Sequence, residues 1–239
     1  MSKTKLKSIA KLRQKKYRLL TGQVVVEGIR AISQIKEYGI IPLEQYCLEG
    51  AGSAIWADVP AYALKDQDMG RICSSEHPQT LAALFPVPGP RKVEFRRAFY
   101  LDGIGDPGNL GAIFRLAAAF GIDCLYLSPQ CVEVSSPKVI RASLGSVYHV
   151  SFEVLPHSKI KDTGAGIFIA DSHKGLSIGE FHPTPYEKVI VAFGSEAHGI
   201  SEGLSSLTPE KLHIQTSGHI ESLNVSIAAG IIAHHLYMA

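Results

Sequence analysis

The chain has 239 residues, 46% hydrophobic and 19% charged, which is the composition of an ordinary globular protein with one large or two small domains. It contains no run of 18 apolar residues and no secretory signal pattern, so membrane spanning and secretion are not indicated and a cytoplasmic protein is expected. The four cysteines are scattered and no Cys/His ligand spacing occurs, so we expect reduced thiols and no metal site.

Positive charge is concentrated at the start of the chain. Residues 1–18 contain eight Lys or Arg and no acid, whereas the remainder holds 16 basic and 22 acidic side chains. Such a segment favours a polyanionic partner, because phosphate contacts supply most non-specific affinity for nucleic acid. Two other interpretations remain open, a helix whose lysines simply face water and a mitochondrial transit peptide. The apolar residues of the segment recur at roughly helical spacing: Leu6, Ile9, Leu12 and Leu19 or Leu20.

Short alternating elements follow the basic segment and predict a small α/β unit. Strands are expected at 24–26 and 43–47, a helix at 28–38, and a last short element at 79–84. Three prolines within residues 86–90, followed by charge, predict a stiff extended linker over 86–97. The predicted domains are therefore 1–85, which includes the basic arm, and 98–239.

The C-terminal part is more regular and predicts a parallel sheet. Its strand candidates are near-continuous apolar runs, as expected for strands that are covered on both faces. Ligands bind beyond the carboxyl ends of the strands in such sheets, and three loops that contain glycine stand at such ends or before the last helix. We expect these loops to line one crevice. The predicted strands are 98–101, 124–127, 167–170, 189–193 and 212–214, and the predicted helices are 112–120 and 222–237.

The first of these loops, residues 102–111, contains a formal GxGxxG pattern. No acid stands at the end of the following strand, and Pro107 removes a backbone donor that a phosphate cradle would use, so a nicotinamide site is excluded. Asn109 is expected to be the N-cap of the next helix and also to converge with Arg115 on one ligand. Arg115 lies in an apolar stretch, where an unpaired guanidinium is costly, so we expect it to be paired or to face phosphate.

The second and third loops carry further polar side chains. In residues 194–199, two glycines allow close approach to a ligand, and Glu196 is a candidate polar anchor, but no hydrolase GxSxG pattern occurs. His198 is expected to be incidental. Residues 218–226 place Glu, Ser and Asn at the start of an apolar helix, where free backbone N–H groups can face a ligand.

Together, the segments 106–111 with Arg115, 194–199 and 221–226 resemble the signature motifs of the SpoU/TrmH family of the SPOUT superfamily, the RNA 2′-O-ribose methyltransferases. Residues 13–28 resemble more loosely the substrate-binding domain that many members carry. The resemblance implies an α/β protein whose C-terminal parallel-sheet domain contains a deep trefoil knot, an exception to the rule against knots. It also implies a homodimer and S-adenosyl-L-methionine as cofactor.

Roles for individual residues follow from the same resemblance. Arg115 would assist deprotonation of the ribose 2′-hydroxyl or hold the adjacent phosphate, and positioning is the physically easier role because the pKa of arginine lies far above neutral. The catalytic set would be Asn109, Arg115, Glu196, Ser222 and Asn224, and the cofactor would contact Gly194, Ile214, Gly218 and Leu223. RNA contacts are expected at Lys11, Arg13, Lys15, Lys16, Arg18 and Arg141.

One segment departs from the family pattern. Members often have Ile-Pro-Met before the glycine of the third motif, whereas this chain has Gln215 and Thr216 after Ile214. Gln215 and Thr216 restore a backbone donor and add polarity near the expected adenine pocket. Ribosomal RNA is favoured over tRNA as the substrate; a catalytically inactive RNA-binding relative that acts in ribosome assembly and a methyltransferase for small molecules or proteins are the alternatives.

Overall fold

The computed structural model describes residues 1–51, 53–207 and 210–239. It divides into two compact units, one formed by 1–89 and 133–149 and the other by 90–132 and 150–239. Residues 133–149 therefore pack with the N-terminal unit, although they lie within the domain predicted over 98–239. None of the described helices combines the length and the apolar character needed to cross a membrane.

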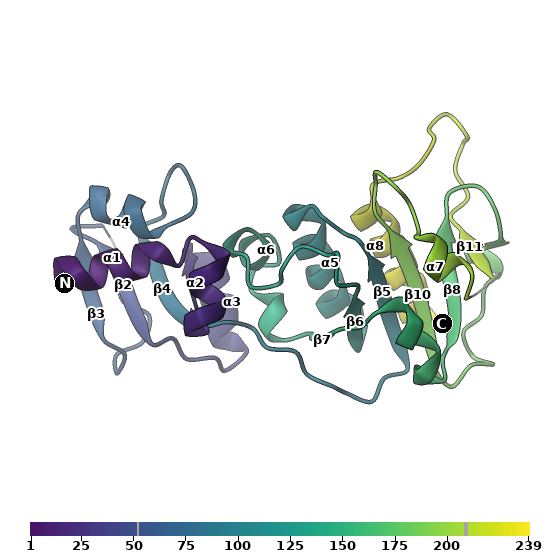
Figure 1. Cartoon of the computed structure of the whole chain (residues 1–239), viewed down its shortest axis with the longest axis horizontal. Coiled ribbons are helices and arrows are strands. Elements are labelled where there is room, and N and C mark those ends of the chain that lie inside the picture. Colours follow the sequence, from purple (N-terminus) through teal and green to yellow (C-terminus); the bar gives the residue numbers. More distant parts are fainter. Residues whose placement is uncertain (52, 208–209) are drawn as a thin grey trace. The chain divides into compact units, whose positions relative to one another are not determined.

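A four-stranded sheet organises the N-terminal unit, with the strand order β1-β4-β2-β3 (Figure 1). β4 runs antiparallel to both of its neighbours, and β2 and β3 are parallel. The expected α/β unit is thus present, with β3 as a strand that the sequence patterns did not predict. The strands are β1 (Gln23–Glu27), β2 (Glu44–Leu48), β3 (Ala61–Leu64) and β4 (Leu81–Pro86).

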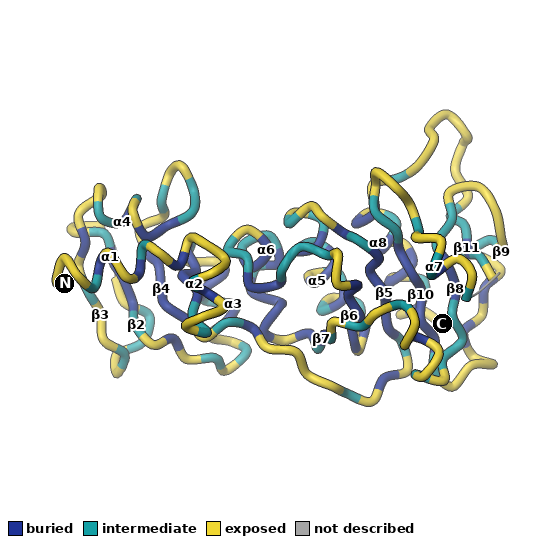
Figure 2. The backbone as a smooth tube through the Cα atoms, in the orientation of Figure 1, coloured by how far each residue is buried: buried dark blue, intermediate teal, exposed yellow. Residues whose placement is uncertain are grey.

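Two helices formed by the basic segment belong to the body of this unit. Leu6, Ile9 and Leu12 are buried with residues of the sheet and of α4 in one hydrophobic cluster. The segment is therefore no detached arm, and Figure 2 shows buried and exposed positions along its tube. Its lysines are exposed except Lys5, which is partly buried and pairs with Glu44. The helices of the unit are α1 (Lys3–Lys11), α2 (Lys15–Thr21), α3 (Ile29–Glu37), α4 (Asp66–Ile72) and α6 (Pro137–Ala142).

The helical spacing predicted across the basic segment breaks between α1 and α2. Leu19 and Leu20 are 65% and 76% exposed, while Arg18 is buried. The turn at 12–14 restarts the helix in a new phase, so Arg18 takes the inward position that the uninterrupted spacing assigned to a leucine. The prediction that Leu19 or Leu20 continues the buried face is therefore wrong.

The C-terminal unit is built on a seven-stranded sheet with the order β7-β6-β5-β10-β8-β11-β9. All of its strand pairs are parallel, as predicted from the apolar runs. The mixed α/β fold with a parallel C-terminal sheet is confirmed, and the trefoil knot stays a prediction. The strands are β5 (Arg97–Asp102), β6 (Cys124–Leu127), β7 (Ser151–Val154), β8 (Gly166–Asp171), β9 (Leu176–Ser177), β10 (Val189–Gly194) and β11 (Lys211–His213).

Two long helices of this unit pack against each other, α5 (Pro107–Phe120) and α8 (Val225–Met238). Gly230 allows the close approach, because a Cβ atom there would lie 3.3 Å from the Leu116 side chain. The ring of Phe120 also meets the rings of His234 and Tyr237, with centroids 5.5 and 6.2 Å apart. A short helix, α7 (Glu202–Ser205), follows β10, and 3-10 turns occupy Ser146–Tyr148, His157–Thr163 and Ile178–Glu180.

Candidate active site

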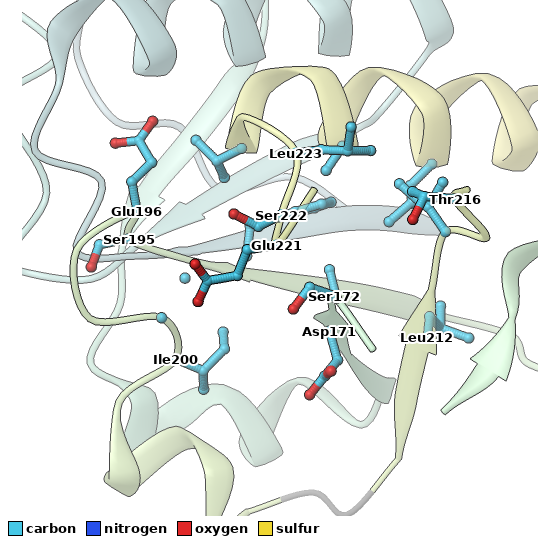
Figure 3. Close-up of a pocket in the computed structure, with 18 of the residues that line it drawn as sticks. Asp171, Ser172, Ser195, Glu196, Ile200, Leu212, Thr216, Glu221, Ser222 and Leu223 are labelled. Atoms are coloured by element: carbon cyan, nitrogen blue, oxygen red, sulfur yellow. The ribbon is translucent and has the colours of Figure 1, made fainter. Parts of the chain in front are cut away.

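The carboxyl ends of β8, β10 and β11 surround a cavity of about 320 Å³ (Figure 3). Its size lies within the range of small-molecule and cofactor sites. Its lining includes the apolar side chains of Ile200, Leu212, Ile214 and Leu223, together with carboxylates and hydroxyls from the strand ends and from the loop before α8. The second and third predicted loops therefore line one crevice, whereas no residue of the first loop, 102–111, is among the described residues that line it. The polar side chains on its wall are Asp171, Ser172, Ser195, Glu196, Thr216, Glu221 and Ser222.

Gly194 makes the turn at the end of β10 possible. The loop folds back on itself, so that Ser195 and Gly199 exchange backbone hydrogen bonds of 3.0 and 2.8 Å. A Cβ atom at Gly194 would lie 2.1 Å from the carbonyl carbon of Gly199, which no side chain can tolerate. The buried carboxylate of Asp102 at the end of β5 accepts a 2.8 Å hydrogen bond from the Ser201 amide and fixes the other end of this loop.

The first loop contributes Asn109, whose side chain is available because another residue caps the helix. Asp106 is the N-cap of α5, and its Oδ1 accepts a hydrogen bond of 2.8 Å from the Asn109 amide. The interpretation of Asn109 as a plain N-cap is therefore wrong. Its side-chain Nδ2 instead donates to Oε1 of Glu196, across 87 residues of sequence. The ends of β5 and β10 are thereby linked through two of the predicted catalytic residues.

Asn224 completes this polar cluster from the third loop. It is the N-cap of α8, and its Oδ1 accepts from the amide and the hydroxyl of Ser226, at 2.9 and 2.7 Å. Because that oxygen is engaged, Nδ2 points the other way, 3.1 Å from Asn109 Oδ1 and 3.4 Å from Glu196 Oε1. Asn109, Glu196 and Asn224 thus form one hydrogen-bonded trio, which we call the amide–carboxylate trio.

The remaining predicted catalytic and cofactor residues divide into those that line the cavity and those that do not. Ser222, Gly194, Ile214 and Leu223 line the cavity, whereas Gly218 and Arg115 are not among the described residues that do. Arg115 is exposed on α5 and has no ion pair or hydrogen bond with the described part of this chain. Within one chain, Arg115 therefore makes no hydrogen bond or ion pair with the described residues of the trio.

Asp171, on the cavity wall at the end of β8, was not among the predicted site residues. Burial alone would raise the pKa of this carboxyl, but Lys211 Nζ at 2.7 Å and the amides of His173 and Lys174 outweigh it and lower the pKa. A carboxylate held anionic at the site can attract a cationic group. Its position directly after an apolar strand was the sequence signal that could have identified it.

The residues predicted to contact RNA divide by exposure. Lys11, Arg13, Lys15 and Lys16 are exposed on α1, on α2 and in the turn between them. Arg18 is only 3% exposed; its Nη1 donates to the carbonyl oxygens of Leu12 and Arg13 at 2.9 Å, and its Nη2 pairs with Glu133. Arg18 therefore stabilises the turn and does not face a ligand.

Comparison with known proteins identifies relatives over the whole chain. The sequence model of the SpoU rRNA Methylase family matches residues 96–234, and that of the MRM3-like substrate binding domain matches residues 3–83. The 23S rRNA (guanosine(2553)-2′-O)-methyltransferase RlmP of Bacillus subtilis is 28% identical, over 97% of this chain and 95% of its own length. A 23S rRNA (adenosine(1067)-2′-O)-methyltransferase of Streptomyces laurentii is 32% identical, over 56% of this chain and 51% of its own.

A solved structure extends the likeness to the fold. The SpoU methyltransferase AviRb of Streptomyces viridochromogenes, determined in complex with AdoMet, has a TM-score of 0.83 and 21% identity. The match covers 99% of this chain and 98% of that one.

Proposed function

Since this chain belongs to the SpoU rRNA Methylase family, we propose that it transfers a methyl group from S-adenosyl-L-methionine to a ribose 2′-hydroxyl of structured RNA. The observation that carries the proposal is the convergence of the amide–carboxylate trio beside the strand-end cavity. Polar groups held in fixed orientation next to an enclosed ligand site are what positioning catalysis requires.

The cavity suits the cofactor by size and chemistry. Ile214, Leu212 and Leu223 offer apolar surface for the adenine ring, and Gly194 lets the backbone of the loop approach closely. Asp171 and Glu221 are carboxylates on the same wall, which complements the positive charge of the sulfonium and the amino group. At the departure from the family pattern, Thr216 lines the cavity and its Oγ1 accepts from the Gly218 amide at 3.4 Å, which supports a cofactor contact there. The bound cofactor supplies an already activated methyl group.

The trio fixes the geometry around the acceptor hydroxyl. Both amide side chains donate to the same oxygen of Glu196, so its Oε2 has no hydrogen bond within the described residues. That oxygen is left to accept from the ribose hydroxyl, and Ser222 offers a further hydroxyl on the same wall. Arg115, which carries a permanent positive charge, holds the neighbouring phosphate and so aligns the ribose.

A homodimer explains two features of α8 and α5. The outer face of α8 carries Ile227, Ile231 and Met238, which are 56%, 39% and 71% exposed and recur at helical spacing. A helix that is apolar all round is normally covered on both sides, and a second copy of the chain would cover this stripe. Arg115 lies on the adjacent helix α5, so the second copy would also bring its own amide–carboxylate trio within reach of Arg115.

Ribosomal RNA is the favoured substrate. The match to the MRM3-like substrate binding domain covers residues 3–83, and two of the relatives are named as 23S rRNA enzymes. The exposed basic residues of α1 and α2 add sequence-independent affinity for either RNA. An inactive RNA-binding relative would not need the intact trio, which favours the enzyme over that alternative.

Calorimetric titration with S-adenosyl-L-methionine tests the proposal first. We expect micromolar binding, about −8 kcal/mol, followed by incorporation of a labelled methyl group into an unmodified 23S rRNA transcript and less into tRNA transcripts. Nuclease digestion of the product would then show a 2′-O-methylated ribose. Methyl transfer to a base, or cofactor binding without transfer to any RNA, would contradict the proposed reaction.

A further inference from the structure

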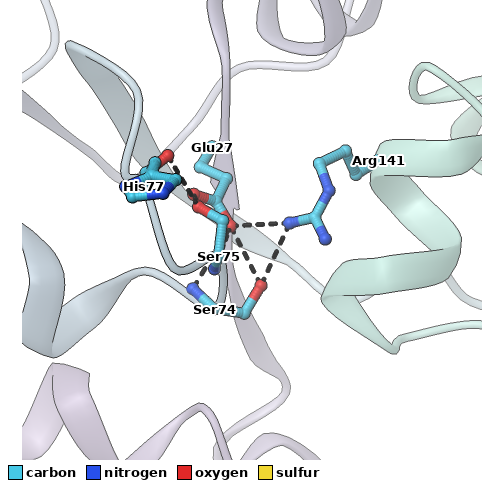
Figure 4. Close-up of polar contacts among 5 residues, drawn as sticks. All are labelled: Glu27, Ser74, Ser75, His77 and Arg141. Atoms are coloured by element: carbon cyan, nitrogen blue, oxygen red, sulfur yellow. Dashed lines mark hydrogen bonds and ion pairs between the residues drawn. The ribbon is translucent and has the colours of Figure 1, made fainter.

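A buried carboxylate in the N-terminal unit holds Arg141 by one edge of its guanidinium (Figure 4). Glu27, the last residue of β1, is 4% exposed. Its Oε1 accepts from Arg141 Nη1 at 2.7 Å, from the Ser74 amide and hydroxyl at 3.2 and 2.9 Å, and from the Ser75 amide at 3.0 Å. Its Oε2 accepts from the Ser75 hydroxyl. The carboxylate is therefore fully engaged.

The guanidinium, in contrast, is only half used. Nη1 donates to Glu27 and also lies 3.3 Å from the Ser74 hydroxyl, which leaves Nε and Nη2 without an acceptor among the described residues. The side chain of Arg141 is 39% exposed. These two nitrogens form the edge with which arginine binds a phosphate in bidentate geometry. Because Nη1 is anchored, the free edge is held in one orientation and loses little freedom on binding.

The surroundings of Arg141 are positively charged. Lys138 is exposed one turn earlier on α6. Arg13 and Arg141 both act on the thiol of Cys73. Burial and Glu27 raise the pKa of this thiol to about 12, and the positive charges of the two arginines oppose that rise. The two arginines therefore lie within electrostatic reach of one sulfur atom. Arg18 bonds to the carbonyl oxygen of Arg13 and to Glu133, which holds the basic turn beside the start of the 133–149 segment.

We propose that Glu27 is a positioning residue that presents the Nε–Nη2 edge of Arg141 to a backbone phosphate of the RNA. This inference rests on the proposed RNA substrate and adds to it a phosphate contact on the N-terminal unit. The competing explanation is that Arg141 only neutralises a buried carboxylate, whose charge is costly without a partner.

Three variants separate the two explanations: Arg141→Gln, the double variant Glu27→Gln/Arg141→Gln, and Arg71→Gln as a matched control. Arg71 belongs to the same unit, its side chain is 56% exposed, and among the described residues it pairs only with the half-buried Asp68. Binding of an unmodified 23S rRNA transcript is measured over a series of salt concentrations, together with thermal unfolding and cofactor titration for each protein.

We expect Arg141→Gln to lower both the melting temperature and the RNA affinity, the latter about tenfold or more, with a salt slope shallower by about 0.9. The double variant should recover the melting temperature, because no buried charge is left unpaired, but not the RNA affinity. Arg71→Gln should match the wild type in every measurement.

The outcomes that overturn the proposal are specific. If the double variant recovers RNA affinity and salt slope along with stability, Arg141 serves only to neutralise Glu27. An unchanged affinity in Arg141→Gln has the same meaning. Wild-type protein that binds neither S-adenosyl-L-methionine nor the transcript would instead overturn the proposed function itself, which keeps the two failures distinguishable.

Discussion

Glu196 shows how single side chains in this protein obtain their geometry from distant parts of the chain. One oxygen of its carboxylate receives amide donors from Asn109, in the first turn of α5, and from Asn224, just before α8. Each asparagine is itself fixed near a helix start, Asn109 beside the N-cap Asp106 and Asn224 as the N-cap of α8. The carboxylate is thereby oriented before any substrate binds, which is the preorganisation that electrostatic catalysis needs.

Arg115→Ala tests the residue that the described structure leaves outside this network. We expect methyl transfer to fall about 100-fold or more, because the variant cannot make a charge-assisted hydrogen bond to phosphate, while cofactor affinity stays within a factor of about two. Single-turnover methylation and calorimetry measure the two effects separately. Arg96→Ala, an exposed arginine just before β5, is the control. Wild-type turnover in Arg115→Ala would exclude its proposed role.

Asp171 gives a pH prediction whose sign follows from its contacts. The pKa of Asp171 in the folded protein is lowered, chiefly by Lys211. The ion pair therefore stabilises the folded protein at pH values above the ordinary aspartate pKa of about 3.9. This stabilisation is lost as the pH falls through the lower pKa of Asp171 in the folded protein. The unfolding free energies of wild type and Asp171→Asn should therefore differ at neutral pH and converge in acid. In ¹³C NMR, Lys211→Met should raise the pKa of this carboxyl. Lys159→Met, which removes the exposed partner of Asp162, should leave the pKa of Asp171 unchanged. An Asp171 carboxyl that titrates at or above pH 4 in the wild type would contradict the prediction.

At the scale of helices and strands, the sequence predicted best where one pattern dominated. The apolar runs of β5, β6 and β10 were found because strands covered on both faces leave no polar positions. The two-residue β9 carries too little pattern to be seen. The burial of the Arg18 side chain could not be predicted either, because it depends on a contact with Glu133, which is 115 residues away in the sequence. Identities of site residues came from motif resemblance, whereas their hydrogen bonds required the fold.

The exposed stripe on α8 gives a prediction about association. Ile231→Glu places a charge in the middle of this stripe, and the cost of burying it against a second copy should dissociate the proposed dimer. Sedimentation velocity at micromolar concentration should show a dimer for the wild type and a monomer for the variant. Leu176→Glu changes another exposed apolar residue of the same unit, 45% exposed, and should stay dimeric. A monomeric wild type would contradict the assignment.

At the scale of the whole molecule, the chain passes between its two units more often than the sequence indicated. The composition shift at the prolines predicted one boundary, and the structure has a boundary there, between residues 89 and 90. The return of residues 133–149 to the N-terminal unit was not predictable, because it depends on pairings such as Arg141 with Glu27 and Tyr148 Oη with the Pro86 carbonyl, 2.8 Å away. Contacts between residues so far apart in the sequence cannot be predicted from local composition.

The charge distribution of the whole chain gives a last prediction, which has to be tested without removing chain. Deleting residues 2–18 would also remove Leu6, Ile9 and Leu12 from a buried cluster, so any loss of RNA binding would be confounded by unfolding. Lys11→Gln, Arg13→Gln and Lys16→Gln together change only exposed charges. We expect an unchanged melting temperature, weaker binding to the 23S rRNA transcript, and a salt slope shallower by about 0.9 for each phosphate that the variant no longer neutralises.

The control for this triple variant removes the same charge from the C-terminal unit, through Lys159→Gln, Lys161→Gln and Lys174→Gln, all at exposed positions. Both variants lower the net charge of the chain equally, so an effect of overall charge would appear in both. A slope change confined to the N-terminal variant assigns the phosphate binding to α1, α2 and their turn. If neither slope changes, these lysines and Arg13 only keep the outer face of two packed helices in water, and the RNA must be held through other residues.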